Sequence, residues 1–251
     1  LIILPVMLYM IFFKIHFDLL YKPGDGSGSM NTLFQVNMPD SNMETQPRWV
    51  QPLDQITLRS QGPNSQLLHS HSQLYPNGSK QRQITVYGYK DSNNIWQIEF
   101  PRKIEGTIVS GALKGGDRFR LNHVFTGGNL HSHEIPNHVD GKHWEVSGYA
   151  DQDNGDSYDD WIVEIVDQLY SSDKAYSKEN EVGNEQWENA IHPISTTFKV
   201  RHAELGCYLA TTGASYPTWG FSQGEVVCLY PKGSLLSFLD TSTHWNIESV
   251  E

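Results

Sequence analysis

Two pairs of histidines, each split by a single residue, are the positions in this sequence whose type and spacing could do chemistry. One pair is His69 and His71, and the other is His131 and His133. Residues two apart on a β-strand point to the same face, so each pair could present two imidazoles to one metal ion or one polar ligand. No third metal ligand can be identified near either pair. The sequence therefore predicts no metal site.

A polar ligand is the other use of these pairs, because Ser70 and Ser132 stand between the histidines. Imidazole and hydroxyl groups give and accept hydrogen bonds, as sugar hydroxyls do. The same groups could instead bond to neighbouring turns and support the fold. The sequence leaves both roles open.

Catalytic arrangements do not stand out elsewhere in the sequence. There is no Ser/His/Asp order, no Gly-rich phosphate loop and no paired catalytic carboxylates. The acidic stretch from Asp151 to Asp160 lacks the closing bidentate Glu of an EF-hand loop, and we interpret it as a solvated turn. We expect no catalytic residue and no cofactor in this domain.

The elements that must position the histidines come in three copies of one unit. Each copy opens with a strand of alternating apolar and polar residues, continues through a leucine-centred stretch and a third strand, and closes on the pattern Trp-x-(Ile/Val)-Glu. The opening strands are expected at residues 56–60, 119–123 and 198–202. The closing patterns begin at Trp96, Trp161 and Trp245.

Four short strands in each of three units make about twelve strands, which predicts an all-β fold. One unit cannot cover its own apolar face or its edges, whereas three units around a pseudo-threefold axis can close a barrel and cap it with hairpins. We therefore predict a β-trefoil over residues 49–251, with repeats at about 54–104, 115–169 and 195–251. The three closing tryptophans are expected to be core residues.

The first twenty residues differ from the rest. Residues 1–13 are an uncharged apolar run broken only by Pro5, shorter than the ~20 residues that span a bilayer. No basic stretch precedes the run and no small-residue cleavage point follows it, which disfavours a signal peptide; a buried core segment is the third alternative. We interpret residues 1–20 as the end of a transmembrane helix and residues 21–48 as a linker.

Composition narrows the classes of partner. The formal net charge of −11 argues against nucleic acid, which requires a basic face, and gives no support to binding at anionic lipid. Frequent, scattered Gly and Pro are typical of a turn-rich β protein.

The units LLHSH…ITVYGYKDSNNIW and NLHSH…WEVSGYADQDNGDSYDDW resemble the MIR motif, which is shared by protein O-mannosyltransferases, inositol trisphosphate and ryanodine receptors, and small secreted stromal-factor-like proteins. The apolar start followed by HFDLLYKPGDGSGSM, and the third unit with its PTWGF and two cysteines, are similar to the protein O-mannosyltransferases. The third unit departs from the motif because CYLAT has lost both histidines. The candidate ligand-binding positions are Leu68, His69, Ser70, His71, Leu130, His131, Ser132, His133 and Leu209.

The resemblance implies a membrane enzyme of the endoplasmic reticulum that transfers mannose from dolichyl-phosphate mannose to Ser or Thr hydroxyls of secretory proteins. This domain would lie in the lumen, bind acceptor polypeptide or O-mannosyl glycan, and belong to a dimer with a related transferase subunit. In that family the catalytic acidic pair lies in an earlier loop, so this chain alone is expected to be inactive.

Alternatives belong to other classes of protein. A soluble MIR protein of lumenal quality control would need a cleavable signal and usually a retention tail, whereas this chain stops at IESVE. The ligand-binding region of a calcium-release channel would need a basic cluster. A purely structural role at a dimer interface stays open.

The lumenal placement has two covalent consequences. In an oxidising compartment Cys207 and Cys228 would pair as a disulfide. Asn77, in an Asn-Gly-Ser triplet within a turn, becomes a candidate for N-glycosylation.

Overall fold

The computed structural model divides the chain into two compact units, Leu1–Thr45 and Gln46–Glu251. The residues that it describes are 3–27, 30–41, 43–101, 111–151, 154–168, 189–231 and 240–251. The predicted repeat ends at residues 104 and 169, and residues 28, 29 and 42 of the predicted linker, lie outside this set.

The first unit contains helix α1 (Ile3–Leu19) and helix α2 (Thr32–Val36). Pro5 is tolerated in the first turn of α1, where its missing N–H has no helical partner. Apolar side chains are exposed along the whole of α1. Over the described residues, no helix combines the length and the apolar character that crossing a membrane requires. The interpretation of residues 1–20 as the end of a transmembrane helix stays a prediction.

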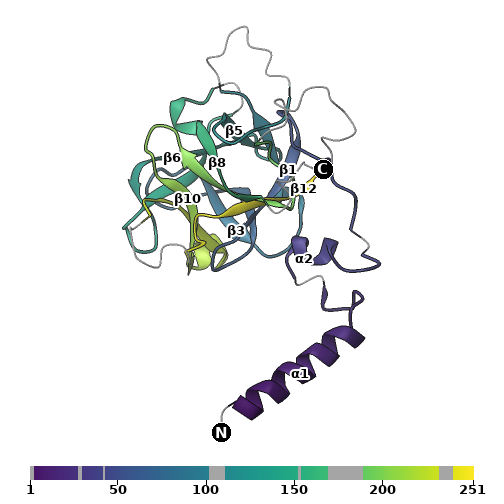
Figure 1. The fold of residues 1–251 in the computed structure, drawn as a ribbon. Helices are drawn as coiled ribbons and strands as arrows, with labels where there is room; N and C mark the ends of the chain where they lie inside the picture. Colours follow the sequence, from purple (N-terminus) through teal and green to yellow (C-terminus); the bar gives the residue numbers. More distant parts are fainter. Residues whose placement is uncertain are drawn as a thin grey trace. The chain divides into compact units, whose positions relative to one another are not determined.

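The second unit is built from β-strands, and the prediction of an all-β fold is confirmed for it (Figure 1). The strands of its described part are β1 (Gln55–Ser60), β2 (Leu67–Leu74), β3 (Arg82–Tyr87), β4 (Trp96–Glu99), β5 (Arg118–His123), β6 (Asn129–Pro136), β7 (Trp144–Tyr149), β8 (Trp161–Gln168), β9 (Thr196–His202), β10 (Tyr208–Ser215), β11 (Gly224–Leu229) and β12 (Trp245–Val250). Single-turn 3-10 helices precede β4, β8 and β11; they are η2 (Ser92–Asn94), η3 (Ser157–Asp159) and η6 (Thr218–Gly220).

Six of these strands form a closed ring. Antiparallel pairs run from β1 to β12, β9, β8, β5 and β4, and from β4 back to β1. The other six strands form the hairpins β2–β3, β6–β7 and β10–β11. The second strands of these hairpins pair with one another, β3 with β7, β7 with β11 and β11 with β3. Closure leaves every strand of the ring with two neighbours, so the ring has no free edge.

The three tryptophans of the closing pattern are fully buried in one core cluster. Each donates its indole N–H to the backbone carbonyl of the leucine at the start of its own hairpin. These hydrogen bonds are Trp96 to Leu68 (3.1 Å), Trp161 to Leu130 (2.9 Å) and Trp245 to Leu209 (2.9 Å). The same contact therefore joins ring and hairpin in all three repeats.

Two buried histidines, His123 and His202, stand directly opposite tryptophans in the ring. His123 is in register with Trp96, and His202 is in register with Trp161. The Nε2 atom of His123 bonds to the Asn93 carbonyl at 2.9 Å, and that of His202 bonds to the Tyr158 carbonyl at 2.8 Å. Both carbonyls belong to the 3-10 turn before the tryptophan, so each imidazole secures the turn of the preceding repeat. No pattern in the sequence singled out these histidines.

Acid should destabilise the ring through these histidines. Burial lowers the pKa of His123 and His202 to about 4, from an ordinary 6.5. Between these values the unfolded chain takes up protons that the folded chain does not, so the free energy of unfolding should fall as the pH falls from 6.5 to 4, by roughly 2 kcal/mol per histidine. Denaturant titrations at pH 7 and pH 4.5 measure the loss. The His202→Gln variant should lose less than the unchanged chain, whereas His16→Gln, on α1, should match it; equal losses in all three would contradict this account.

Removal of one indole hydrogen bond should destabilise the second unit. Trp161→Phe leaves the buried Leu130 carbonyl without its donor and creates a small cavity, so we expect a loss of roughly 2–4 kcal/mol in the free energy of unfolding. The matched control is Trp144→Phe, because Trp144 packs against the same core but its indole N–H has no hydrogen-bond partner among the described residues. Urea denaturation of both variants gives the comparison, and a loss no larger for Trp161 than for Trp144 would refute the proposed role of the bond.

Candidate functional site

The histidine pair of the first repeat lies on β2. His69 and His71 share one face of the strand, as alternation requires, and both are buried. The Nδ1 atom of His69 lies 2.8 Å from the side-chain oxygen of Asn94 in η2. The amide nitrogen of Asn94 donates to the Tyr89 carbonyl at 2.8 Å. Nδ1 of His69 must therefore carry the hydrogen, and the orientation of the ring is held by the turn before Trp96.

Aromatic rings extend this site in both directions. The ring of His69 lies 5.0 Å from Tyr87 and 5.6 Å from His71, measured between centroids. Beyond them, Tyr89 lies 5.5 Å from Tyr87, and Phe221 lies 5.1 Å from His71. We call these five residues the aromatic row. Phe221 belongs to the third repeat, so two repeats build this row.

The imidazoles of the first repeat are neutral at physiological pH. Burial lowers the pKa of His69, and burial together with the neighbouring His69 lowers the pKa of His71. Neither ring nitrogen of His71 has a hydrogen-bond partner within the part of the chain that the structure describes. The Gln223 side chain lies close enough to this ring to act on its pKa, which it raises by hydrogen bonding, and its oxygen also accepts a hydrogen bond from Thr85 at 2.7 Å. Gln223 is therefore the polar neighbour of this buried imidazole.

The second repeat repeats this geometry with a carboxylate in place of the amide. The Nδ1 atom of His131 donates to buried Asp159 of η3 at 2.8 Å. Its Nε2 atom lies 2.8 Å from Nδ1 of His133, and the ring of Tyr149 lies 4.6 Å away. Burial and the neighbouring His131 lower the pKa of His133.

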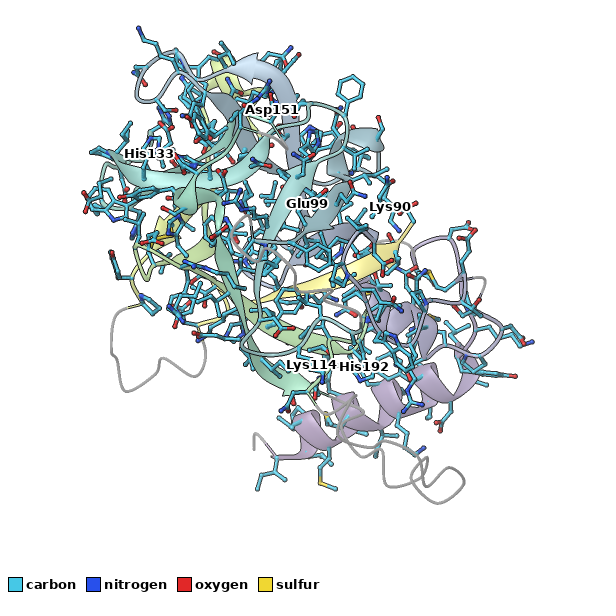
Figure 2. The ribbon with its side chains drawn as sticks, turned by 90° about the horizontal axis from the view of Figure 1, so that it is seen from above. Lys90, Glu99, Lys114, His133, Asp151 and His192 are labelled. Atoms are coloured by element: carbon cyan, nitrogen blue, oxygen red, sulfur yellow. A yellow bond between two sulfur atoms is a disulfide. The ribbon has the colours of Figure 1, made fainter. Side chains whose placement is uncertain are left out.

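The Nε2 atom of His133 lies at the end of the series of hydrogen bonds that runs from Asp159 through His131 to His133. His133 is half-buried on β6 (Figure 2), and its Nε2 atom has no partner among the residues described. The hydrogen bond between the two imidazoles occupies Nδ1 of His133, so Nε2 is the ring nitrogen of His133 that remains for another partner. A hydroxyl group, which both donates and accepts, could satisfy it.

His131, Asp156 and Asp159 form a group of possible metal ligands. Each offers one ligand atom, a ring nitrogen or a carboxylate oxygen, and these atoms lie within 4.8 Å of one another. The carboxylate of Asp159 is already occupied, because it accepts from His131, from the Asn129 side chain at 3.2 Å and from the Asp156 N–H at 2.8 Å. The guanidinium of Arg120 also lies 3.7 Å from it. The arrangement suits an ordered polar turn better than a cation. The absence of a metal site stays a prediction.

The two serines of the histidine pairs bond to the fold. The hydroxyl of Ser70 donates to the Gln83 carbonyl at 3.1 Å, and that of Ser132 donates to the Glu145 carbonyl at 2.8 Å. In each case the carbonyl belongs to the other strand of the hairpin. Leu68 and Leu130 are buried in the core. Among the predicted positions of these two repeats, the histidines are therefore the ones left to meet a ligand.

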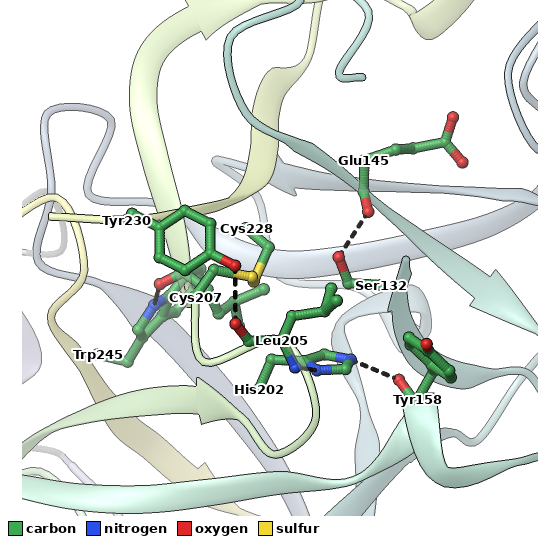
Figure 3. Close-up of a disulfide and its surroundings, with 10 residues drawn as sticks. Ser132, Glu145, Tyr158, His202, Leu205, Cys207, Cys228, Tyr230 and Trp245 are labelled. Atoms are coloured by element: carbon green, nitrogen blue, oxygen red, sulfur yellow. Dashed lines mark hydrogen bonds between the residues drawn. A yellow bond between two sulfur atoms is a disulfide. The ribbon is translucent and has the colours of Figure 1, made fainter. Parts of the chain in front are cut away.

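The third repeat carries a disulfide near the position of a histidine site. Strand register places Ala210 and Thr212 where the first repeat has His69 and His71. Leu209, which precedes them, is fully buried. Cys207 and Cys228 are joined by a disulfide with an S–S distance of 2.07 Å that links the residue just before β10 to β11 (Figure 3). The disulfide thus adds a covalent link within this repeat, next to the hydrogen bond from Trp245 to Leu209.

The candidate glycosylation position, Asn77, is exposed in the turn between β2 and β3. Its side-chain oxygen lies 2.9 Å from Nδ1 of His138 in the second repeat. The hydroxyl of Ser79 donates to buried Glu145. The turn is therefore ordered by the neighbouring repeat, and glycosylation of Asn77 stays a prediction.

The residues that orient the histidines were not predicted from the sequence. Asn94 and Asp159 each stand two residues before a closing tryptophan, a position occupied by Thr243 in the third repeat. A polar residue there in all three copies was an available signal. Phe221 offered no such signal, because its contact with His71 crosses between repeats.

Known proteins resemble the chain over nearly all its length. The family model of the MIR domain matches residues 65–234. Dolichyl-phosphate-mannose–protein mannosyltransferase 6 of Saccharomyces cerevisiae is 48% identical over 99% of this chain and 32% of the relative, and mannosyltransferase 3 of that organism is 42% identical over 100% and 32%. The chain spans about a third of the length of the curated relatives it matches.

Solved structures also resemble the chain over most of its length. The S. cerevisiae protein O-mannosyltransferase Pmt1–Pmt2 complex bound to the sugar donor matches with a TM-score of 0.75 and 32% identity, over 98% of this chain and 32% of that chain. The SDF2-like protein of Arabidopsis thaliana matches with a TM-score of 0.62 and 24% identity, over 79% of this chain and 94% of that one. The latter likeness concerns the fold alone.

Proposed function

Because the chain belongs to the MIR domain family of the protein O-mannosyltransferases, we propose that it is the lumenal MIR domain of such an enzyme in the endoplasmic-reticulum membrane. The whole protein would transfer mannose from dolichyl-phosphate mannose to Ser or Thr hydroxyls of secretory proteins. The similarity to a third of each relative supports a domain within a larger enzyme. The similarity to a chain of the Pmt1–Pmt2 complex supports a dimer with a related transferase subunit.

Three MIR repeats folded as a β-trefoil are the architecture of this domain. The closed ring of six strands and the three mutually paired hairpins support this interpretation. The recurrence of one indole-to-leucine hydrogen bond in each repeat supports it further.

The domain binds acceptor polypeptide or its attached mannose through the first two repeats. The observation that carries this proposal is that each of these repeats orients one histidine on a turn, and that a nitrogen of the second histidine lacks a hydrogen bond of good geometry among the described residues. Unsatisfied buried polar groups are costly, so their persistence suggests a ligand that completes them. Neutral imidazoles donate and accept, which suits hydroxyl groups.

Weak binding would be sufficient for this role. A few hydrogen bonds at each site provide modest affinity, but a site tethered to the catalytic part of the same enzyme meets its ligand at high effective concentration. The domain would hold acceptor chains near the membrane surface where transfer takes place.

NMR titration of the 251-residue chain in detergent tests ligand binding. The ligands are mannose, an O-mannosylated Ser/Thr-rich peptide and the same peptide unmodified. We expect shifts clustered at residues 68–71 and 130–133. A response to the mannosylated ligands alone would identify product recognition, and a response to the bare peptide would identify an acceptor clamp.

Matched variants tell specific binding from general effects. His71→Ala and His133→Ala should each abolish the shifts in their own repeat. Thr212→Ala, at the equivalent position of the third repeat, should change neither set. Silence from all three ligands at millimolar concentration would reject the binding function and favour a purely structural role.

Transfer activity is not expected of this chain alone, because the sequence predicts no catalytic arrangement within it. Incubation with dolichyl-phosphate mannose and a Ser/Thr-rich peptide should yield no mannosylated product, while the S. cerevisiae Pmt1–Pmt2 complex serves as the positive control. Turnover above the protein-free background would overturn this expectation.

A further inference from the structure

We infer that Asn77 is a site of spontaneous deamidation, and that the imidazole of His138 accelerates the reaction by donating a hydrogen bond to the reacting amide. The site is the turn between β2 and β3, where Asn77 and Gly78 are exposed. The reaction converts the side-chain amide to a carboxylate without an enzyme. This inference does not depend on the ligand binding proposed above.

The residue after Asn77 has to be glycine in this fold. The φ angle of Gly78 is 66°, in the left-handed region that glycine adopts at little cost. A Cβ atom at this position would overlap a carboxylate oxygen of Glu145 and would lie 3.2 Å from the imidazole of His138. With no side chain on Gly78, nothing on that residue hinders the approach of its backbone nitrogen to the Asn77 side chain.

The side chain of His138 is positioned to act on the Asn77 amide. Its Nδ1 atom lies 2.9 Å from the side-chain oxygen of Asn77, and because an amide oxygen only accepts, Nδ1 is the donor. Its Nε2 atom lies 2.8 Å from a carboxylate oxygen of buried Glu145, within ion-pair distance although not at the angle of a hydrogen bond. The ring stacks on Tyr75 with a centroid distance of 4.2 Å. The imidazole is thus held between a carboxylate and the amide.

The reaction requires water as its co-reactant and no other. The backbone nitrogen of Gly78 forms a bond to the side-chain carbonyl carbon of Asn77, and negative charge develops on the oxygen that His138 contacts. The bond from this carbon to the amide nitrogen then breaks, and the nitrogen leaves as ammonia with the proton that Gly78 loses. Water opens the resulting cyclic imide at either carbonyl to give aspartate or isoaspartate. A donor aimed at an oxygen where charge develops lowers the barrier of such a step.

A second Asn-Gly pair provides an internal comparison. Asn154 precedes Gly155 shortly before η3, and its amide nitrogen donates to the two carboxylate oxygens of Asp151 at 2.8 Å and 2.9 Å. These contacts engage the nitrogen of the amide and leave its oxygen without a donor of this kind. Among the described residues, no histidine forms a hydrogen bond with Asn154. The inference therefore predicts different reactivity for two identical dipeptides.

Deamidation would alter the contact between the first and second repeats. The new carboxylate would face His138 beside buried Glu145, so two negative charges would share one imidazole. Isoaspartate would also add a methylene group to the backbone of the turn. The reaction removes the amide to which a glycan would be joined, so deamidation of Asn77 excludes its later glycosylation.

Peptide mass spectrometry of the 251-residue chain during incubation at neutral pH tests the inference. The chain is produced in bacteria and kept in detergent, so that Asn77 carries no glycan. In the folded chain Asn77 should deamidate several-fold faster than Asn154. In urea the two rates should become nearly equal, because unfolding separates Asn77 from His138. Equal rates in the folded chain, or a ratio that urea leaves unchanged, would overturn the inference.

A variant of His138 isolates the contribution of its imidazole. His138→Phe keeps an aromatic ring against Tyr75 and removes the donor, so deamidation of Asn77 should slow by roughly tenfold, the effect of losing one hydrogen bond to a developing charge. Asn154 should keep its rate, and His16→Phe, on α1, should change neither rate. Thermal unfolding shows whether each variant is folded; should His138→Phe be unfolded, the comparison in urea decides. A folded His138→Phe chain that loses the Asn77 amide at the unchanged rate would show that the imidazole plays no part.

Discussion

The hydrogen bond from each closing tryptophan to a leucine carbonyl is the contact on which the rest of this domain depends. It joins the ring to the hairpin within one repeat, and it also fixes the local geometry of the site. Leu68 directly precedes His69, and Asn94 stands two residues before Trp96. Once the indole of Trp96 reaches the Leu68 carbonyl, the turn before the tryptophan lies beside the imidazole. One buried hydrogen bond thus serves both the core and the site.

The three repeats use this common frame for different chemistry. An amide orients the histidine of the first repeat, and a buried carboxylate, Asp159, orients that of the second. The third repeat has alanine, Ala210, in place of the histidine, and it carries a disulfide between Cys207 and Cys228 nearby. Because the frame is supplied by the ring and the tryptophans, the residues beside it could diverge without loss of the fold. The consequence is two related histidine pairs in surroundings of different polarity, and a third repeat without such a pair.

Contacts between repeats are as important as contacts within them. The hydroxyl of Tyr75 lies 3.0 Å from the Val146 carbonyl and 3.0 Å from the hydroxyl of Tyr216, so it meets groups from all three repeats. Burial raises the pKa of both tyrosine hydroxyls well above the usual range, and they remain hydrogen-bonding groups at any physiological pH. This junction holds the three hairpins together, which is the condition for Phe221 of one repeat to face His71 of another.

Local pattern in the sequence was enough to predict the all-β class, the order of the strands, the buried tryptophans and the shared face of each histidine pair. These features depend on periodicity and composition within a few residues, which a single sequence contains. The partners of the histidines were decided only by tertiary structure. Asn94 and Asp159 reach them because a closing strand returns to its own hairpin, and Phe221 reaches His71 because β11 pairs with β3. Such contacts depend on register between distant strands, and no local pattern specifies that register.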